Sequence, residues 1–260
     1  MKAGKIYRRA IKRNLKPYFA NWLPGDSREL GEYGEFKGGI FRPIGNVKDF
    51  GVEFIEKIDP SPDNHEFGAS GAANVNFYAK GKLDPSANAA MEIAFTKEWA
   101  VYFKAIDARA NRIADKNDLG KQILTLYKSG KWKRRWVIIT DVVSAGRTIT
   151  AVSASNDSRI VLEAAAEIET INPVDASIEL QATISSRVGY QVSGAAMQPL
   201  IGFSKVQMRF FTPVFRAKAL PATTRSTVAP YLDSPELVQV RPEDLFFGQL
   251  MNDDTEILDE

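Results

Sequence analysis

The middle of this chain alternates small or apolar residues with polar residues, and this period of two is typical of a β-strand with two different faces. The pattern runs through residues 148–155, 159–168 and 176–188. It also marks residues 73–79, 91–106 and 201–211. A half-buried antiparallel sheet produces this alternation, and so do the strands of a β-sheet that crosses a bilayer. A chain built from such segments is predicted to be organised around a sheet.

Other segments complete the predicted fold. The apolar run at residues 137–143 predicts a buried strand. Leu119 and Ile123 belong to an apolar stripe that predicts a helix over 115–129, ended by Gly130. Glycine-rich residues 21–52 predict turns that join short strands. We therefore predict an α+β fold, in which a twisted, mainly antiparallel sheet carries a few peripheral helices.

The charge is concentrated at the two ends of the chain. The net charge is only +2, from 34 basic and 32 acidic residues. Residues 1–16 carry seven basic side chains and no acidic one, whereas residues 233–260 carry nine acidic side chains against one arginine. The first block is thus +7 and the last is −8. Opposite blocks can attract each other, or each can serve a separate partner.

The basic block also has the periodicity of an amphipathic helix. Tyr7, Ile11 and Leu15 recur every four residues, the basic residues fall largely on the other side, and Pro17 ends the pattern. Such a helix can lie on an anionic membrane. It can also pack on its own domain with a solvated basic face, or serve as a basic arm for nucleic acid.

Residues 131–136 interleave lysine and arginine with Trp132 and Trp136. Tryptophan among basic residues can stack on bases or lie at a membrane interface. The alternative is the end of a strand, where the tryptophans cap the core and the basic groups face water.

Motifs for catalysis, cofactors and metals are missing from the sequence. There is no cysteine, and His65, at the edge of a predicted loop, is the one histidine. We find no phosphate-binding loop, dinucleotide fingerprint or nucleophile elbow. Asp141, inside the apolar run, is either a hydrogen-bonded structural group or a functional one. We therefore expect no catalytic residue, metal or cofactor, although carboxylates from several strands could still form a hydrolase site.

The chain is expected to divide into three parts: a basic helix at 1–20, one α+β core domain at 21–215, and a linker with an acidic segment at 216–260. Arg216, Lys218 and Arg225 mark the linker as a candidate cleavage site. The apolar residues near 245–251 predict a short helix or a docked segment. With no run of 18 apolar residues and no secretory signal, a cytoplasmic protein is expected.

In outline the chain resembles the pore-forming domain of bacterial gasdermins over residues 35–210. The resemblance lies in the order of segments: Phe-Arg-Pro-Ile-Gly-Asn-Val at 41–47, a helix before 136–143, the small-residue strands, and Gln-Pro-Leu-Ile-Gly-Phe-Ser-Lys-Val-Gln at 198–207. It implies amphipathic strands that become membrane hairpins on oligomerisation, and a short C-terminal segment that keeps the protein inactive until proteolysis. The N-terminal cysteine that is acylated in some bacterial members is absent, so no lipid anchor is carried over.

The leading hypothesis is therefore a non-enzymatic, pore-forming effector that is cytoplasmic until it associates with a membrane. Its expected partners are anionic lipid, further copies of itself on the membrane, and an activating protease. The predicted membrane-binding residues are Lys2, Lys5, Arg8, Arg9, Lys12, Arg13, Lys16, Trp132, Lys133, Arg134 and Arg135. The alternative is a soluble module that binds protein or nucleic acid through the basic N-terminal helix.

Overall fold

The structure, a computed structural model, describes residues 2–21, 24–68, 72–208 and 245–250. This part of the chain contains the α-helices α1 (Lys2–Asn14) and α2 (Lys116–Lys128), and the 3-10 helix η1 (Val47–Phe50). Its strands are β1 (Phe19–Ala20), β2 (Glu32–Lys37), β3 (Ile40–Asn46), β4 (Glu56–Ile58), β5 (Asp63–Gly68), β6 (Ala73–Tyr78), β7 (Ala90–Phe95), β8 (Val101–Ile113), β9 (Trp136–Ser153), β10 (Arg159–Ala164), β11 (Leu180–Ser186), β12 (Val188–Met208) and β13 (Leu245–Leu250).

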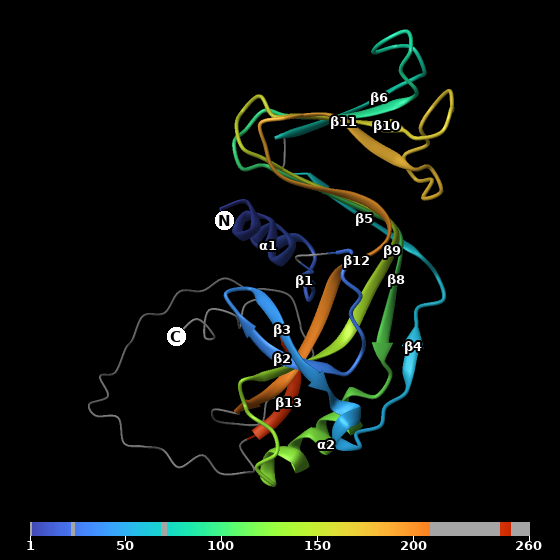
Figure 1. Cartoon of the computed structure of the whole chain (residues 1–260). Coiled ribbons are helices and arrows are strands. Elements are labelled where there is room, and N and C mark those ends of the chain that lie inside the picture. Colours follow the sequence, from blue (N-terminus) through green and yellow to red (C-terminus); the bar gives the residue numbers. More distant parts are fainter. Residues whose placement is uncertain (1, 22–23, 69–71, 209–244, 251–260) are drawn as a thin grey trace, which may run out of the picture.

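The larger sheet has nine strands and is built on the long strands β8, β9 and β12. Strand β9 lies between β8 and β12. Its N-terminal end also pairs with β2 of the β2–β3 hairpin. Strands β4 and β5 pair with β8, while β1 and β13 pair with β12. Figure 1 shows the three long strands running together through a bend toward the smaller sheet.

The smaller sheet has four strands in the order β11-β10-β7-β6. Met91 and Ile93 of β7 face the same side as Leu162 and Ile160 of β10, their direct partners. These side chains are buried against the upper part of the larger sheet. Every strand pairing described in either sheet is antiparallel. The predicted α+β fold with a mainly antiparallel sheet is thus confirmed.

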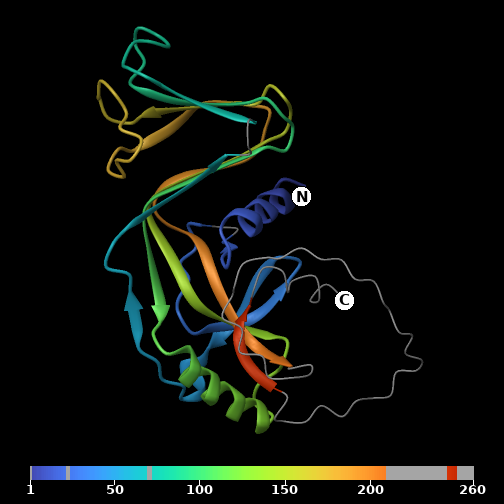
Figure 2. The ribbon, with the colours of Figure 1, turned by 180° about the vertical axis from the view of Figure 1, so that it is seen from behind.

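The two α-helices cover different parts of the larger sheet. Helix α1 lies between the smaller sheet and the β2–β3 hairpin, an order that both views keep (Figures 1 and 2). Helix α2 packs Leu119 and Ile123 into a core at the other end of the sheet. It begins at Asp115, whose carboxylate accepts two backbone N–H groups, and is followed by Gly130 at φ +75°. The helix predicted over 115–129 is confirmed.

The predicted strands differ from the observed ones mainly in length. Residues 137–143 and 148–153, predicted to lie in separate strands, belong to the single strand β9, and residues 154–155 of the second predicted strand lie beyond its end. Residues 201–208 similarly continue β12, which begins at Val188. His65, placed at the edge of a loop by the sequence, lies inside β5 opposite Ala105.

Candidate functional site

Helix α1 uses its apolar face to bind the sheet. Tyr7 and Ile11 have no exposed surface and pack with Phe103, Val143 and Leu200. The rings of Tyr7 and Phe103 lie 6.4 Å apart between centroids. The apolar face is therefore committed to the protein, and the polar face of the helix is the one that solvent or a partner can reach.

Three cations on that polar face have no partner among the residues that the structure describes. Lys5, Arg9 and Arg13 follow one another at spacings of four, so they form one stripe along the helix. All three are exposed. We call them the cationic stripe. They carry the positive charge that remains available for binding an anion.

The other four basic residues of this segment are engaged within the protein. The ammonium group of Lys2 lies 4.4 Å from the ring centroid of Trp99, a cation–π contact. Arg8, Lys12 and Lys16 each interact with another residue. Lys2 and Lys16 are exposed, whereas Arg8 and Lys12 are half-buried. The seven predicted membrane-binding residues of the N-terminal segment thus fall into an engaged set and an available set.

The β2–β3 hairpin places apolar and basic side chains beside α1. Its turn uses Gly38 and Gly39 at φ +59° and +73°, which L-residues with side chains rarely adopt. A Cβ atom on Gly39 would lie 2.8 Å from Arg8 Nε, so the hairpin tip contacts the helix. Ile40 and Ile44 on β3 are 42% and 51% exposed. The tip of the hairpin therefore contacts α1 at Arg8, and the exposed isoleucines of β3 follow in the sequence after that tip.

This hairpin surface was not among the predicted site residues. Lys37 and Arg42 on the hairpin are also exposed. The signal in the sequence was the Gly38–Gly39 pair flanked by basic and apolar residues, which is typical of a hairpin turn. Its position next to α1 depends on contacts between distant segments, and the sequence does not show these.

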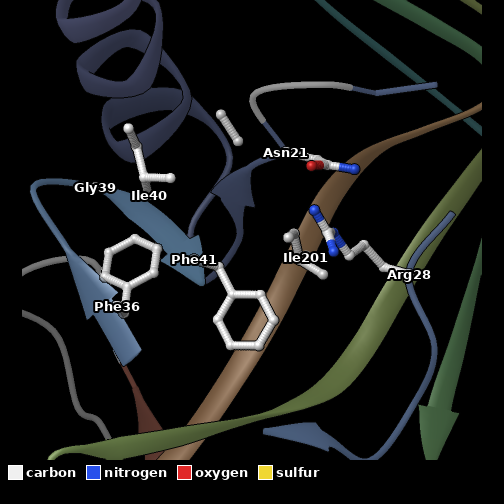
Figure 3. Close-up of a pocket in the computed structure, with 8 residues that line it drawn as sticks. Asn21, Arg28, Phe36, Gly39, Ile40, Phe41 and Ile201 are labelled. Carbon is white, nitrogen blue, oxygen red and sulfur yellow. The ribbon is translucent and has the colours of Figure 1, made fainter. Parts of the chain in front are cut away.

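A cavity of about 160 Å³ lies under the hairpin (Figure 3). Phe36, Phe41 and Ile201 supply its apolar wall. Its two polar groups have partners: Arg28 lies 3.6 Å from Asp26 and 3.7 Å from Glu32, and Asn21 donates to the carbonyl of Gln198. These internal contacts fix the base of the hairpin against β1 and β12.

The second predicted basic segment divides into buried tryptophans and exposed cations. Trp132 and Trp136 are 3% and 9% exposed, and both rings contact Tyr33. Lys133, Arg134 and Arg135 are exposed, and Arg135 Nε lies 2.7 Å from Glu35 Oε1. Trp132 is thus part of the core here. The arrangement is the alternative in which tryptophans cap the core and basic groups face water.

Asp141 is a paired, buried carboxylate. Its side chain is 4% exposed, and the ammonium group of Lys116 lies 2.7 and 2.9 Å from its two oxygens. Arg112 Nε is 3.7 Å away, and the hydroxyl of Thr140 donates to Asp141. Such compensation is what a charge needs in a protein interior. Asp141 therefore connects the start of α2 to the sheet, as the structural interpretation predicted.

Perturbed titrations elsewhere have structural causes. Burial, together with the carboxylate of Glu66, raises the pKa of Tyr102. Burial lowers the pKa of Arg147, whose guanidinium donates to the carbonyls of Asp175 and Ala176. Among the described residues no cluster of histidine and carboxylates could hold a metal ion.

The predicted linker and C-terminal segment lie only partly within the described residues. Arg216, Lys218 and Arg225 lie outside the described residues. Residues 245–250 form β13, which pairs with residues 203–208 of β12. These six residues are therefore docked on the sheet, as a strand rather than a helix. In the described part of the chain, no helix is both long and apolar enough to cross a membrane.

Neither the comparison with protein-family models nor the comparison with curated proteins found a match for this chain.

Proposed function

We propose that this protein is a non-enzymatic, membrane-acting effector of the gasdermin-like, pore-forming kind, restrained by its C-terminal segment. The observation that carries the proposal is that α1 exposes its cationic stripe while the hairpin in contact with α1 exposes Ile40 and Ile44. An anionic bilayer offers negative headgroups and an apolar interior within a few ångströms of each other. The cationic stripe suits the layer of negative headgroups, and the exposed isoleucines suit the apolar interior.

The expected binding energy is sufficient for a reversible membrane encounter. Each basic residue near an anionic surface contributes about 1 kcal/mol, so the stripe supplies about 3 kcal/mol. Ile40 and Ile44, each about half exposed, add the burial of apolar area when they enter the interface. This first contact needs no rearrangement, because both groups already lie at the surface.

Insertion would then use the strands of the smaller sheet. Strand β11 contains no charged residue, and its residues 181–186 are exposed. It continues through Arg187 into β12, while β10 follows β9 after a short turn. Straightening these connections would give antiparallel strands longer than the roughly 9–11 residues that cross a bilayer. Copies of the protein on the membrane would join their strands to satisfy backbone hydrogen bonds.

Strand β13 is the proposed restraint. It occupies the edge of β12 over residues 203–208, beside the position where β1 pairs. While it stays paired, this edge cannot accept a strand from another copy. Cutting the linker between β12 and β13 would convert an intramolecular strand pairing into a weaker bimolecular one.

Vesicle leakage tests the proposal. A site-specific protease sequence placed within residues 217–225 allows the intact, folded protein to be cut on demand. We expect dye release from phosphatidylserine-containing vesicles after cutting, little release before it, and little release from phosphatidylcholine vesicles. No release from either vesicle after complete cutting would contradict the proposal.

The same surface could bind nucleic acid through its cations alone. That alternative predicts strongly salt-dependent binding to nucleic acid that lipid does not compete for. The exposed isoleucines of β3 favour the membrane, because nucleic-acid backbones offer no apolar layer to bury them. Retention on nucleic acid without any binding to anionic vesicles would favour the alternative.

A further inference from the structure

We propose that the groove between α1 and the edge of the larger sheet is a binding site for one long-chain fatty acid. The groove has a volume of about 460 Å³ and is separate from the cavity under the hairpin. This volume lies within the range of small-molecule sites, about 300–1,000 Å³. The site requires only a single lipid anion and is independent of whether the protein permeabilises membranes.

The groove has an apolar side, and its polar lining side chains, Arg9, Arg13 and Asn14, all come from α1. Phe67 of β5 and Val101 of β8 line it from the sheet, and Ile6 and Ala10 line it from the helix. Phe67 is held in place by stacking on Phe103, with ring centroids 5.3 Å apart. A hydrocarbon chain laid in this groove would remove apolar surface from water on both sides.

Two arginines at the rim supply the charge. Arg9 and Arg13 both line the groove, and they are the two guanidinium groups of the cationic stripe. Neither has a carboxylate partner among the described residues. Because they are four residues apart on one helix face, one carboxylate can reach both. Guanidinium groups bind carboxylates through paired, charge-assisted hydrogen bonds.

Trp99 contributes a further aromatic wall to the groove. It lines the same groove, and its indole N–H is buried without a hydrogen-bond partner in the described part of the chain. Its backbone lies at φ +61°, an uncommon conformation for a bulky residue. Because this N–H has almost no accessible surface, it does not open into the groove, and the proposed site depends on the arginines and the apolar lining.

Together these features select an amphiphilic anion over other ligands. A free inorganic anion would leave the apolar floor exposed to water, and an uncharged hydrocarbon would leave the arginines unused. A nucleotide would require further polar groups, because apart from Arg9, Arg13 and Asn14 the lining side chains are aliphatic or aromatic. A carboxylate with one acyl chain uses both parts of the groove.

Calorimetric titration of the full-length protein with oleate, below its micelle concentration, tests the inference. We expect saturable binding at one molecule per chain. Methyl oleate keeps the chain without the charge, and acetate keeps the charge without the chain. Both are expected to bind at least about tenfold more weakly than oleate. Loss of the charge-assisted hydrogen bonds, or loss of the buried chain, each lowers the affinity by more than that factor.

Two double variants separate the groove from general charge. Arg9→Gln with Arg13→Gln should weaken oleate binding about tenfold or more. Lys121→Gln with Lys128→Gln removes the same charge from exposed sites on α2 and should leave it unchanged. Thermal melting confirms that each variant is folded, and Ala10→Leu, which narrows the groove, should also weaken binding.

Binding of methyl oleate as tight as that of oleate, or equal binding by the Arg9/Arg13 variant and the parent, would overturn the proposed site. Absence of saturable oleate binding by the parent protein would do the same. Vesicle leakage measured on the same samples is a separate readout. Leakage without oleate binding refutes the groove alone, and oleate binding without leakage refutes the membrane proposal alone.

Discussion

Replacing the cationic stripe should weaken membrane binding by a calculable factor. The variant Lys5→Gln, Arg9→Gln, Arg13→Gln removes the three cations that have no partner among the described residues, so no internal ion pair is lost. At about 1 kcal/mol each, the loss is about 3 kcal/mol, or roughly a hundredfold in the partition coefficient. The fold stability should change by no more than about 0.5 kcal/mol, as is usual at exposed sites.

Co-sedimentation with phosphatidylserine-containing vesicles measures the partition coefficient of each variant. The matched control, Lys57→Gln, Lys121→Gln, Lys128→Gln, removes three exposed cations from β4 and α2. It should bind nearly as well as the parent. Binding of the parent should fall as salt is raised, because the screening length is about 10 Å at 0.1 M ionic strength. Equal losses in the two variants would refute the role of the stripe, as would no loss in either.

Three further predictions concern the fold. Lys116→Met should destabilise the protein by about 3 kcal/mol in urea unfolding, because it leaves a buried carboxylate without its nearest cation. This loss should be larger than that of Asp141→Asn. A larger loss in Asp141→Asn would be inconsistent with the pairing described. Gly34→Ala should destabilise the hairpin and lower the melting temperature, since its Cβ would lie 2.0 Å from a backbone carbonyl oxygen on the facing strand; an unchanged melting temperature would argue against this close approach. Hydrogen bonds from Ser177 lower the pKa of Asp175, so their stabilising contribution is present above pH about 4 and is lost as the pH falls through the lowered pKa. Ser177→Ala should therefore raise the pKa of Asp175 in an NMR titration. An unchanged pKa would show that another group lowers it.

The sequence was sufficient to predict the type of most elements but not the length of the longest strands. Alternation identified β6 and β7, and the apolar stripe identified α2. The two segments predicted for β9 are separated by residues 144–147, which include Gly146, and glycine weakens a strand locally. In the structure, the ladder with β12 continues through this region. Pairing with distant neighbours thus overrides a weak local propensity.

Strand β12 shows the same effect at Pro199. A proline cannot donate to a ladder and predicts the end of a strand. Here the pairing of β12 with β9 is irregular between Met197 and Leu200, and the carbonyl of Pro199 accepts the N–H of Asn21 from the segment after β1. The irregularity accommodates the proline, and the contact that stabilises it comes from a residue 178 positions earlier.

The candidate site was only partly predictable for a related reason. The amphipathic pattern of α1 is the same whether its apolar face meets lipid or protein, so the sequence left both interpretations open. Burial of Tyr7 and Ile11 shows that the face meets protein in this structure. Tertiary contacts decide which cations remain available and bring the tip of the β2–β3 hairpin against α1 at Arg8. The same is true of the groove lined by Arg9, Arg13 and Trp99.

A reversible lock on β13 tests the central claim most directly. The chain contains no cysteine, so Lys205→Cys with Gly248→Cys introduces the only thiols, on residues that are direct partners across β12 and β13. Partners in an antiparallel pair have Cα atoms about 4.5–5.5 Å apart, which a disulfide can span. After the linker is cut within 217–225, the oxidised protein should leave anionic vesicles intact, and reduction should start their leakage. Equal leakage in both redox states would contradict the restraint by β13, and no leakage in either state would contradict the membrane action itself.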